Sequence, residues 1–527
     1  MIFAHRNQWG HAFRPDYLKV ARFVKEIRAE RVVCLTATAT PRVAQDICDA
    51  FDVDLTGLFR TPSYRPNLHL LAESFKTNKE KLPKLVSFLR NNPGPSIVYV
   101  TLQQQSEDVA LQLVRQKIKA KAFHAGMKAE DKAQIQDDFM REKDIVIVAT
   151  IAFGMGIDKA DIRNVVHYDI PRSLEGYSQE IGRAGRDGET SKCLLFLCGE
   201  DMHQRESFSR GDLPSRSSIH ALLNEIFSPA NQKLQIGDSL EAKQNNQSRD
   251  YDIRPTTLSV LYAVLELQFE LLRAVTPKYS SYSYIEGKGY TSAIRNDNSP
   301  AAAAIKVSAH KASKWTHIDV DDAAGKTNVS RTDIVRKLND WNEQGLIELK
   351  ATGVVNVYRV LKQLPRTAEE IDELTEELFA QMVTRETQDL WRTQNVIEMM
   401  TAKSCFALGL SKHFGDEHLP DRKTRCGHCT WCLTQTEVKL IGTPEPAWDN
   451  AKFNKILQEV TVRDDPRFLA RVAFGISSPR VTQMKLGHNT VFGLMSDVPF
   501  MVCNIISFIS LYFSLCVAES SLRYRPS

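Results

Sequence analysis

The sequence has little net charge, and this near-neutrality limits what it can offer to a polyanion. Lys and Arg together number 68 and Asp and Glu 64, so the formal net charge is only +4 over 527 residues. No global field therefore favours nucleic acid, and any basic surface must be local. The shares of hydrophobic (43%) and charged (25%) residues are those of an ordinary globular protein. The length allows several domains, each with its own core.

A secretory signal and a disulfide framework are also missing. Residues 1–6 contain no apolar core segment of the kind that an export signal needs. Six of the ten cysteines are scattered among apolar neighbours, whereas four cluster. This distribution predicts one metal site and buried, reduced thiols in a reducing compartment. The clustered cysteines are Cys405, Cys426, Cys429 and Cys432.

Short apolar runs alternate with amphipathic stretches between residues 31 and 197. Continuous β-branched runs separated by helices, such as the polar helix expected over 103–117, indicate a parallel sheet covered on both faces. The sequence therefore predicts an α/β fold. The predicted strands are 32–35, 97–100, 144–149, 164–168 and 193–197.

Two arginines, Arg183 and Arg186, lie one helical turn apart within the glycine-containing segment 178–188. A guanidinium carries a fixed charge and a fork of donors that fits phosphate oxygens. Two such forks on one short helix could stabilise the charge that develops on a transferred phosphoryl group. In parallel α/β sheets ligands bind at the carboxyl ends of the strands, and this helix follows a predicted strand. The alternative is a basic surface turn without a ligand.

A small module begins at Ser330, which has the spacing of a helix cap with Asp333. The helix is expected to end at Gly345 and to be followed by a β-hairpin over 346–358, with its turn at 352–353. Helix followed by hairpin is the winged-helix order. The helix carries Arg331, Arg336 and Lys337, which could meet DNA phosphates; the alternative is a module that docks a protein partner.

The rest of the chain gives weaker signals. Residues 207–250 are polar and are interpreted as a linker with some helix, 279–284 as an exposed strand or wing, and 296–313 as a flexible connector. Residues 369–377 and 382–414 are expected to be helical. The apolar segment 498–518 is long enough for a membrane span, but a buried helix or an abnormal tail is the preferred interpretation, and a membrane partner is not expected.

These motifs together resemble the RecQ family of superfamily 2 DNA helicases. The resemblance is most specific from about residue 9 to 202 and again from Cys405 to Cys432. It rests on the aromatic-rich loop at 8–17, the Thr-Ala-Thr segment at 36–38, Phe123–Met127, Ala149–Lys159, the arginine motif and the cysteine cluster.

The resemblance implies a role for each motif. Gln179, Arg183 and Arg186 would act on the γ-phosphate of ATP, with Gly156 and Asp158 also at the nucleotide. The expected contacts to DNA come from a larger set: Trp9, Phe13, Arg14, Thr36, Thr38, His124 and Thr150. Aromatic rings suit single-stranded DNA because bases stack on them regardless of sequence.

By the same resemblance, the four cysteines form a structural zinc site. Thiolates are soft ligands, and closure by four of them gives a tetrahedral site with no open position for catalysis. His413, His418 and His428 are competing ligands of lower rank. The family usually places this module soon after the second lobe, whereas here residues 207 to about 400 intervene.

Half of the expected nucleotide site is missing from the sequence. No G-x-x-x-x-G-K-[ST] loop occurs, and residues 1–5 stand where an Asp-Glu-Ala-His box would precede the aromatic loop. Without the phosphate lysine and the carboxylates that hold Mg²⁺, most of the transition-state stabilisation is lost. We therefore interpret the chain as an N-terminally truncated member of the family and expect it to hydrolyse no ATP alone.

These features predict an α/β protein built around a RecA-like second helicase lobe. The predicted function is an ATP-dependent 3′-to-5′ DNA helicase in repair and recombination, using ATP with Mg²⁺ and zinc, acting on single strands and duplex junctions, and located in the nucleus of a eukaryote or otherwise in the cytoplasm. The alternative is a non-enzymatic DNA-binding relic. The predicted domains are a first-lobe remnant (1–65), the second lobe (66–205), a linker with a winged-helix-like region (206–314), a winged-helix-like module (315–363), a helical zinc module (366–440) and a tail (441–527).

Overall fold

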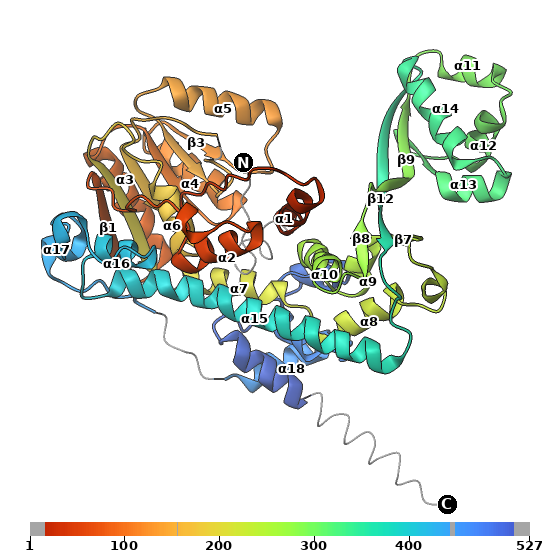
Figure 1. Cartoon of the computed structure of the whole chain (residues 1–527). Coiled ribbons are helices and arrows are strands. Elements are labelled where there is room, and N and C mark those ends of the chain that lie inside the picture. Colours follow the sequence, from red (N-terminus) through yellow and green to blue (C-terminus); the bar gives the residue numbers. More distant parts are fainter. Residues whose placement is uncertain (1–15, 155, 443–447, 511–527) are drawn as a thin grey trace, which may run out of the picture. The chain divides into compact units, whose positions relative to one another are not determined.

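The computed structural model describes residues 16–154, 156–442 and 448–510. Two compact units make up the chain (Figure 1). The first unit combines residues 1–213 with 381–477 and 485–527, and the second combines 214–380 with 478–484. Segments far apart in the sequence therefore meet in the first unit. Trp9, Phe13 and Arg14 lie outside the described residues.

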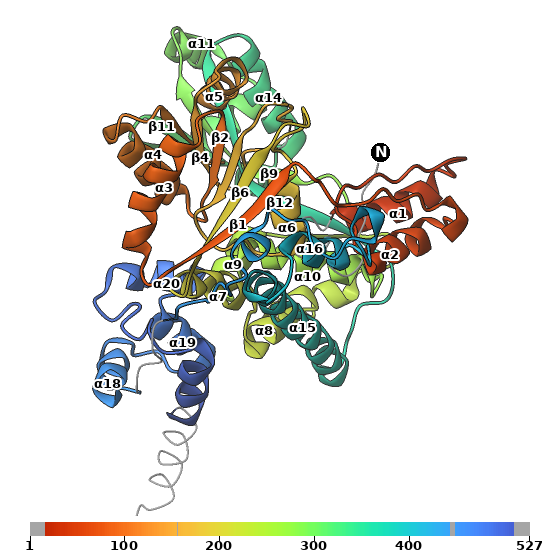
Figure 2. The same ribbon diagram turned by 90° about the vertical axis from the view of Figure 1, so that its left-hand side faces the viewer.

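A six-stranded parallel sheet forms the centre of the first unit, with the strand order β1-β6-β5-β2-β4-β3 (Figure 2). The predicted α/β class with a parallel sheet is confirmed, and β2, β4, β5 and β6 coincide with predicted runs. The strands β1 and β3 were not predicted. The bounds are β1 (Leu68–Phe75), β2 (Ser96–Tyr99), β3 (Ala120–Phe123), β4 (Val146–Ala149), β5 (Asn164–His167) and β6 (Ser191–Cys198).

Helices cover both faces of this sheet, so successive residues of the central strands point into different cores. Ile97 and Val165 lie in the core that α5 and α6 cover, whereas Val98 and Val166 lie in the core that α3 and α4 cover. Two-sided burial explains why the central strands are continuously apolar. These helices are α3 (Lys81–Asn91), α4 (Gln103–Arg115), α5 (Ala129–Arg141) and α6 (Leu174–Ile181).

The expected buried strand at 32–35 is wrong. This segment is extended but pairs with no strand among the described residues, and the side chains of Val33 and Leu35 are 66% and 46% exposed. A strand requires a neighbour for its N–H and C=O groups. Val32 and Cys34 instead pack on a small core formed mainly by α1 (Asp16–Glu26) and α2 (Pro41–Phe51).

The long helix α15 (Ala368–Thr401) covers the acidic and apolar stretches that were predicted to be helical, and α16 (Phe406–His413) follows it. Val396, Met400 and Phe406 pack in the same core as α5 and α6. The C-terminal part of α15 and the residues that follow it thus complete one face of the parallel sheet, together with α17 (Thr430–Thr434) and, at the edge of the unit, α7 (Asp201–Asp212).

The C-terminal residues form further helices, α18 (Asn450–Glu459), α19 (Pro466–Phe474) and a helical stretch over 500–510. Within the predicted apolar segment 498–518, Phe500 and Cys503 are fully buried, whereas Phe508 is exposed; residues 511–518 lie outside the described part. None of the helices described is long and apolar enough to cross a bilayer.

The second unit contains an antiparallel sheet with the order β10-β11-β9-β12-β7, and β8 also pairs with β12. Its helices begin with α8, α9 and α10 and continue with α11 to α14. The bounds are α8 (Arg216–Ile226), β7 (Ser239–Ala242), α9 (Gln244–Asp250), α10 (Pro255–Leu267), β8 (Leu272–Ala274), β9 (Lys278–Glu286), α11 (Tyr290–Asn296), α12 (Pro300–Ser308), β10 (His310–Ala312), β11 (Trp315–Asp319), α13 (Val320–Thr327), α14 (Arg331–Glu343), β12 (Ile347–Val360) and α20 (Pro479–Gln483).

The helix predicted after Ser330 is α14. The Ser330 hydroxyl accepts a hydrogen bond from the Asp333 N–H at 3.1 Å, and Gly345, with φ +70°, follows the end of the helix. Leu338 and Trp341 are buried on its inner face. Capping and periodicity were therefore sufficient to place this helix.

The predicted hairpin over 346–358 is wrong. β12 is one continuous strand that pairs antiparallel with β9, from Ile347 opposite Glu286 to Val355 opposite Lys278. Gly353 lies within the strand with φ +62°, where a Cβ would lie 2.7 Å from the Ser280 Oγ. A β-branched run with one glycine fits a long strand and a hairpin equally well until the partner strand is known.

The flexible connector expected over 296–313 is also wrong. The Ser299 hydroxyl caps α12, Pro300 occupies its first turn, and Ala302 and Ile305 are buried. The alanine-rich composition here reflects close helix packing. The strand predicted at 279–284 is β9, but Tyr282 and Tyr284 are buried rather than exposed.

Candidate nucleotide cleft and metal centre

A cleft of about 1090 Å³ in the first unit collects most of the predicted nucleotide-site residues. Its walls come mainly from residues 32–39, 57–65, 154, 156–158 and from parts of 178–186 and 407–414. Its size is that of a site for a ligand as large as a nucleotide. The predicted residues that line it are Thr36, Thr38, Gly156, Asp158, Gln179, Arg183 and Arg186.

The turn that carries the arginines is held by a helix cap on one side and by two residues that precede β1 on the other. The Ser173 hydroxyl caps the start of α6, accepting from the Gly176 N–H at 3.1 Å. After the helix, the Arg65 guanidinium donates to the carbonyl of Gly185 at 2.7 Å, and the Asn67 amide donates to the same carbonyl at 2.8 Å. Sequence analysis missed Arg65 and Asn67, because only the fold brings them to this turn.

Arg183 is packed against the backbone of the loop after β4. Its Nη1 donates to the Gly154 carbonyl, and a Cβ at Gly154 would lie only 2.2 Å from the Arg183 Cζ. Only glycine therefore fits at this position, which also has φ +147°. The Arg183 Nε is buried and has no hydrogen-bond partner among the described residues. A donor left unsatisfied beside a cleft is available to a ligand oxygen.

Arg186 forms an ion pair with Asp158, 2.6 Å from Nη1 to Oδ1. The Asp158 side chain is 86% exposed, so water screens this pair and its contribution to stability is small. A phosphate could therefore compete with Asp158 for the Arg186 fork at low cost.

Thr36 and Thr38 lie at the other wall of the cleft. The Thr38 N–H donates to the Thr36 hydroxyl at 3.3 Å, which makes a local turn between the extended segment and α2. Thr40 then caps α2, and Pro41 occupies its first turn. Helix capping thus fixes the position of the threonine segment.

His124 and Thr150 are close to each other but do not line this cleft. They follow the neighbouring strands β3 and β4, and the Thr150 N–H donates to the carbonyl of Phe123 at 3.2 Å. The His124 Nε2 lies 3.0 Å from the Glu107 carboxylate, and its Nδ1 is buried without a hydrogen-bond partner in the described structure. The carboxyl edge of the sheet thus has two separate groups of candidate residues.

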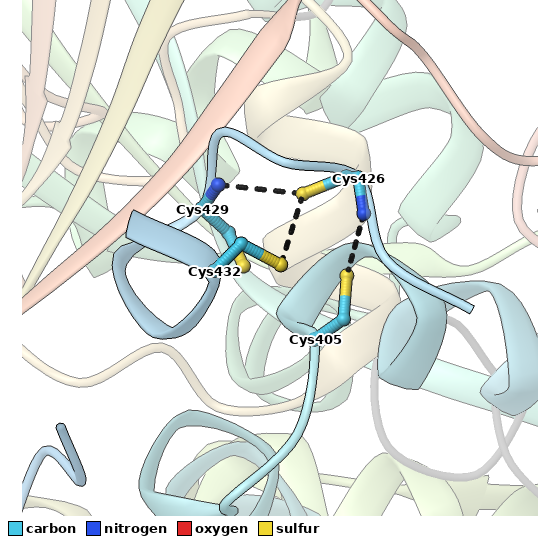
Figure 3. Close-up of side chains that lie close together, drawn as sticks. All are labelled: Cys405, Cys426, Cys429 and Cys432. Atoms are coloured by element: carbon cyan, nitrogen blue, oxygen red, sulfur yellow. Dashed lines mark hydrogen bonds between the residues drawn. The ribbon is translucent and has the colours of Figure 1, made fainter. Parts of the chain in front are cut away.

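The four clustered cysteines come together as the spacing predicts (Figure 3). Their sulfur atoms all lie within 4.8 Å of one another. Tetrahedral zinc with Zn–S bonds of about 2.3 Å requires sulfurs about 3.8 Å apart. The cluster therefore fits a four-thiolate metal centre after a small contraction.

Backbone geometry supports ligation by these sulfurs. Cys405 and Cys429 occupy the N-cap positions of α16 and α17 without making a side-chain capping bond, so both lie at helix N-termini, where thiolates are stabilised. The N–H of Cys426 donates to the Cys405 Sγ at 3.3 Å, and the N–H of Cys429 donates to the Cys426 Sγ at 3.3 Å (Figure 3). Hydrogen bonds from the Cys426 and Cys429 side chains hold the pKa of Cys405 below its usual value.

The competing histidine ligands are not part of this cluster. His413 bonds the Glu175 carboxylate on α6 at 2.8 Å. His428 stacks on His69 of β1, with ring centroids 4.4 Å apart, and its Nε2 lies 3.3 Å from the Tyr64 hydroxyl. These histidines attach the cysteine module to the lobe instead.

The cysteine module is built into the lobe and reaches the cleft. The Ala72 N–H of edge strand β1 donates to the Thr430 hydroxyl at 2.9 Å, and the Asp416 carboxylate accepts from the Ser63 N–H at 2.9 Å. Ser411 and Phe414, at the end of α16 and just after it, line the cleft itself. Sequence analysis did not anticipate this contribution.

In the second unit, the cations of α14 that were expected to meet DNA are paired internally. Arg331 Nε lies 3.1 Å from Asp321, Lys337 lies 3.1 Å from Asp297, and Arg336 lies 3.5 Å from Asp333. These carboxylates reduce the positive potential that α14 can offer to a phosphate backbone.

Comparison with known proteins agrees with this arrangement. The helicase conserved C-terminal domain matches residues 78–188. The chain is 40% identical over 222 residues to mouse ATP-dependent DNA helicase Q5, covering 39% of this chain and 22% of the relative. It is 39% identical over 198 residues to Xenopus laevis RecQ-like DNA helicase BLM, covering 37% and 14%.

A longer match is to ATP-dependent DNA helicase Q-like 5 of Arabidopsis thaliana, 26% identical over 512 residues. These similarities support a RecQ-type helicase of superfamily 2. That match covers 94% of this chain, including the second unit, and 54% of the relative. The chain thus spans about half or less of the length of these RecQ relatives.

Removal of one thiolate tests the metal centre. We expect Cys429→Ser to reduce bound zinc from about one ion per chain to well below half, because a structural site needs four closed ligands. Zinc is measured by elemental analysis of the purified chain. The matched control, Cys34→Ser, removes a half-buried cysteine outside the cluster and should retain the metal. Equal zinc in both variants would contradict the assignment.

The contact between α6 and the cysteine module predicts a pH dependence. Burial raises the pKa of Glu175, but hydrogen bonds with His413 and Ser173 outweigh it and lower the pKa from 4.5 to about 2. A carboxyl with a lowered folded-state pKa stabilises the fold above its unfolded-state value and loses that contribution as the pH falls from 4.5 towards 2.

We therefore expect Glu175→Gln to destabilise the protein by up to about 3 kcal/mol at pH 7, with the difference from wild type shrinking below pH 4.5. Denaturation midpoints measured across this range test the expectation. Glu130→Gln, at an exposed site on α5, is the control. A constant difference between wild type and Glu175→Gln at all pH values would refute the proposed cause.

Proposed function

We propose that this chain is the second motor lobe, with its zinc module, of an ATP-dependent 3′-to-5′ DNA helicase of the RecQ type that acts in repair and recombination. The observation that carries the proposal is the cleft that brings Gln179, Arg183 and Arg186 to one wall and Thr36 and Thr38 to another. The names of the relatives, which are DNA helicases, support the same reaction.

Within this cleft we assign roles by chemistry. Arg183 and Arg186 would neutralise charge on the terminal phosphates, because their forks match phosphate oxygens, Gly154 fixes the position of Arg183, and Arg186 can exchange Asp158 for a phosphate. Gln179, one turn before Arg183 and at the same wall, would orient the attacking water or the phosphate. ATP with Mg²⁺ supplies the reacting phosphoryl group when it is bound.

For DNA we propose the second group of residues at the carboxyl edge of the sheet. The Thr150 hydroxyl and the His124 ring suit one backbone phosphate, since they lie at the ends of adjacent strands. Trp9, Phe13 and Arg14 would supply stacking and charge to a single strand. Single-stranded tails and duplex junctions are the proposed ligands. In a eukaryotic cell this activity belongs in the nucleus.

We propose that zinc at the four cysteines is structural. It would hold α16 and α17 against β1, and α16 would in turn shape the cleft wall. Closed four-thiolate coordination leaves no open position for a substrate. The 315–363 module, whose α14 cations are already paired, suits a protein partner better than a DNA backbone.

A second candidate function is DNA binding without catalysis. It is favoured by the sequence of this chain, which contains no G-x-x-x-x-G-K-[ST] loop to hold the β- and γ-phosphates. The two candidates predict the same DNA contacts but differ in ATP turnover.

The DNA contact can be tested apart from catalysis. We expect Thr150→Val, which removes one hydroxyl and keeps the shape, to weaken binding of a labelled 3′-tailed duplex about three- to tenfold, the net value of about one hydrogen bond. Fluorescence anisotropy at low salt gives the affinity. Thr190→Val, at an exposed position beside β6, should bind as wild type does. Equal affinities for all three proteins would contradict the proposed contact between Thr150 and DNA.

The ATPase reaction separates the two candidate functions. We expect the purified 527-residue chain to show no DNA-stimulated ATP hydrolysis, in contrast to turnover of about 10 s⁻¹ in a typical enzyme. The physical reason is that the arginine pair acts on a nucleotide that a phosphate loop must first hold. Phosphate release with and without DNA is the measurement. Turnover that disappears in Arg186→Ala would show that this chain hydrolyses ATP itself. That result would exclude the second candidate function, DNA binding without catalysis.

A further inference from the structure

Four arginines gather in the first unit where α15 packs against the residues before α6. On α15, Arg385, Asp389 and Arg392 are spaced by four and three residues, so they share one side of the helix. Arg172 forms an ion pair with Asp389, and the Arg392 Nη1 lies 3.4 Å from the same carboxylate. The fourth member is Arg205 on α7. These residues, Arg172, Arg205, Arg385 and Arg392, are named the arginine cluster.

The members of the arginine cluster lie within electrostatic reach of one another. Burial lowers the pKa of Arg205, Arg385 and Arg392; nearby carboxylates oppose this shift in each of them, and the charge of Arg172 adds to it. Among the described residues, Asp389 is the one carboxylate within 4.0 Å of any of the four guanidinium groups. The other carboxylates that act on them are farther away: Asp169, Glu180 and Asp201 at Arg205, Asp212 at Arg385 and Glu175 at Arg392. Like charges are thus held together in a partly buried place, and most of the balancing charge is not in direct contact with the guanidinium groups.

Some donors in the cluster have no acceptor. The Nε and Nη1 of Arg385 and the Nε of Arg205 are buried without a hydrogen-bond partner in the part of the chain that the structure describes. A buried donor of a charged group that stays unpaired is costly, because the group loses its hydration and gains nothing in return. Native proteins rarely retain such groups unless something else satisfies them.

The adjacent carboxylate on the same helix shows what a purely structural pairing looks like. Glu386 accepts from Arg210 of α7 at 2.8 Å and also pairs with Arg467 of α19. The remaining donors of Arg467 reach the carbonyls of Leu213 and Arg210. That group is closed, whereas the arginine cluster, which begins at the neighbouring residue Arg385, is not.

We propose that the arginine cluster binds a phosphate group, with Arg385 as its central donor. Guanidinium forks match phosphate oxygens, and the side chain of Arg172, 45% exposed, provides the opening to solvent. None of the four arginines lines the nucleotide cleft, so this site is distinct from Arg183 and Arg186. The phosphate belongs either to a nucleic-acid backbone or to a small polyphosphate.

Pyrophosphate is the first probe, and it tests the site without reference to DNA or ATP turnover. The full zinc-loaded chain carries Arg183→Ala and Arg186→Ala so that the cleft cannot bind the probe. In this background we expect calorimetry to detect binding that Arg385→Gln weakens at least tenfold. Arg141→Gln, at a side chain that is 69% exposed on α5, is the matched control and should bind as the background does. Undiminished binding in Arg385→Gln, or no binding in the background, would overturn the proposal.

The variant Arg385→Lys distinguishes loss of phosphate binding from a folding defect. It keeps the charge but loses the fork, so we expect an unchanged unfolding temperature without ligand and a smaller rise of that temperature with pyrophosphate than in the background protein. Equal rises in both proteins would count against the site.

The source of the phosphate is distinguished by oligothymidine in place of pyrophosphate. If a DNA backbone is the ligand, Arg385→Gln lowers the slope of log affinity against log salt by about 1. If the slope does not change while pyrophosphate binding is lost, the site takes a small polyphosphate. Either result is independent of the Thr150 measurement, so failure of the DNA proposal and failure of this site are separable.

Discussion

The contact between Arg183 and the backbone of Gly154 is the constraint on which the cleft depends. It joins the loop after β4 to the turn after α6, two segments that a parallel sheet brings to the same edge. A side chain at Gly154 would occupy the volume of the guanidinium. Because Arg65 and Asn67 fix the same turn from the side of β1, the arginine pair is held in place before any ligand arrives, which is the preorganisation that phosphoryl transfer requires.

The metal centre is connected to this cleft by a short path. Cys405 begins α16, and residues at the end of that helix form part of the cleft wall. His413, the last residue of α16, bonds Glu175 in the first turn of α6, which is the helix that leads to Arg183. The cysteine cluster therefore stabilises not only its own loop but also the position of the helix that presents the arginines. A metal ion held by the four cysteines would therefore stabilise both walls together.

Local rules predicted much of this protein, and the failures have a common cause. Continuous apolar runs revealed β2, β4, β5 and β6, and ligand spacing revealed all four cysteines. β1 and β3 were not predicted because polar residues such as His69 and Lys121 interrupt their apolar runs. The strand expected at 32–35, the split of β12 and the contacts of Arg65 all depend on a partner far away in the sequence. Periodicity identifies which residues can form a strand, but not whether a neighbour exists to pair with it.

The topology explains how a large insertion is accommodated between the lobe and its cysteine module. The chain leaves the first unit after α7 and returns along α15. At that point Glu386 of α15 binds Arg210 of α7 and Arg467 of α19, so one buried carboxylate joins the outgoing, returning and C-terminal segments. Because the ends of the insertion are fixed next to each other, the inserted unit adds little loop-closure cost to the first unit. Removing the Glu386 carboxylate would leave two largely buried guanidinium groups without their shared acceptor, so we expect it to weaken the connection between these three segments.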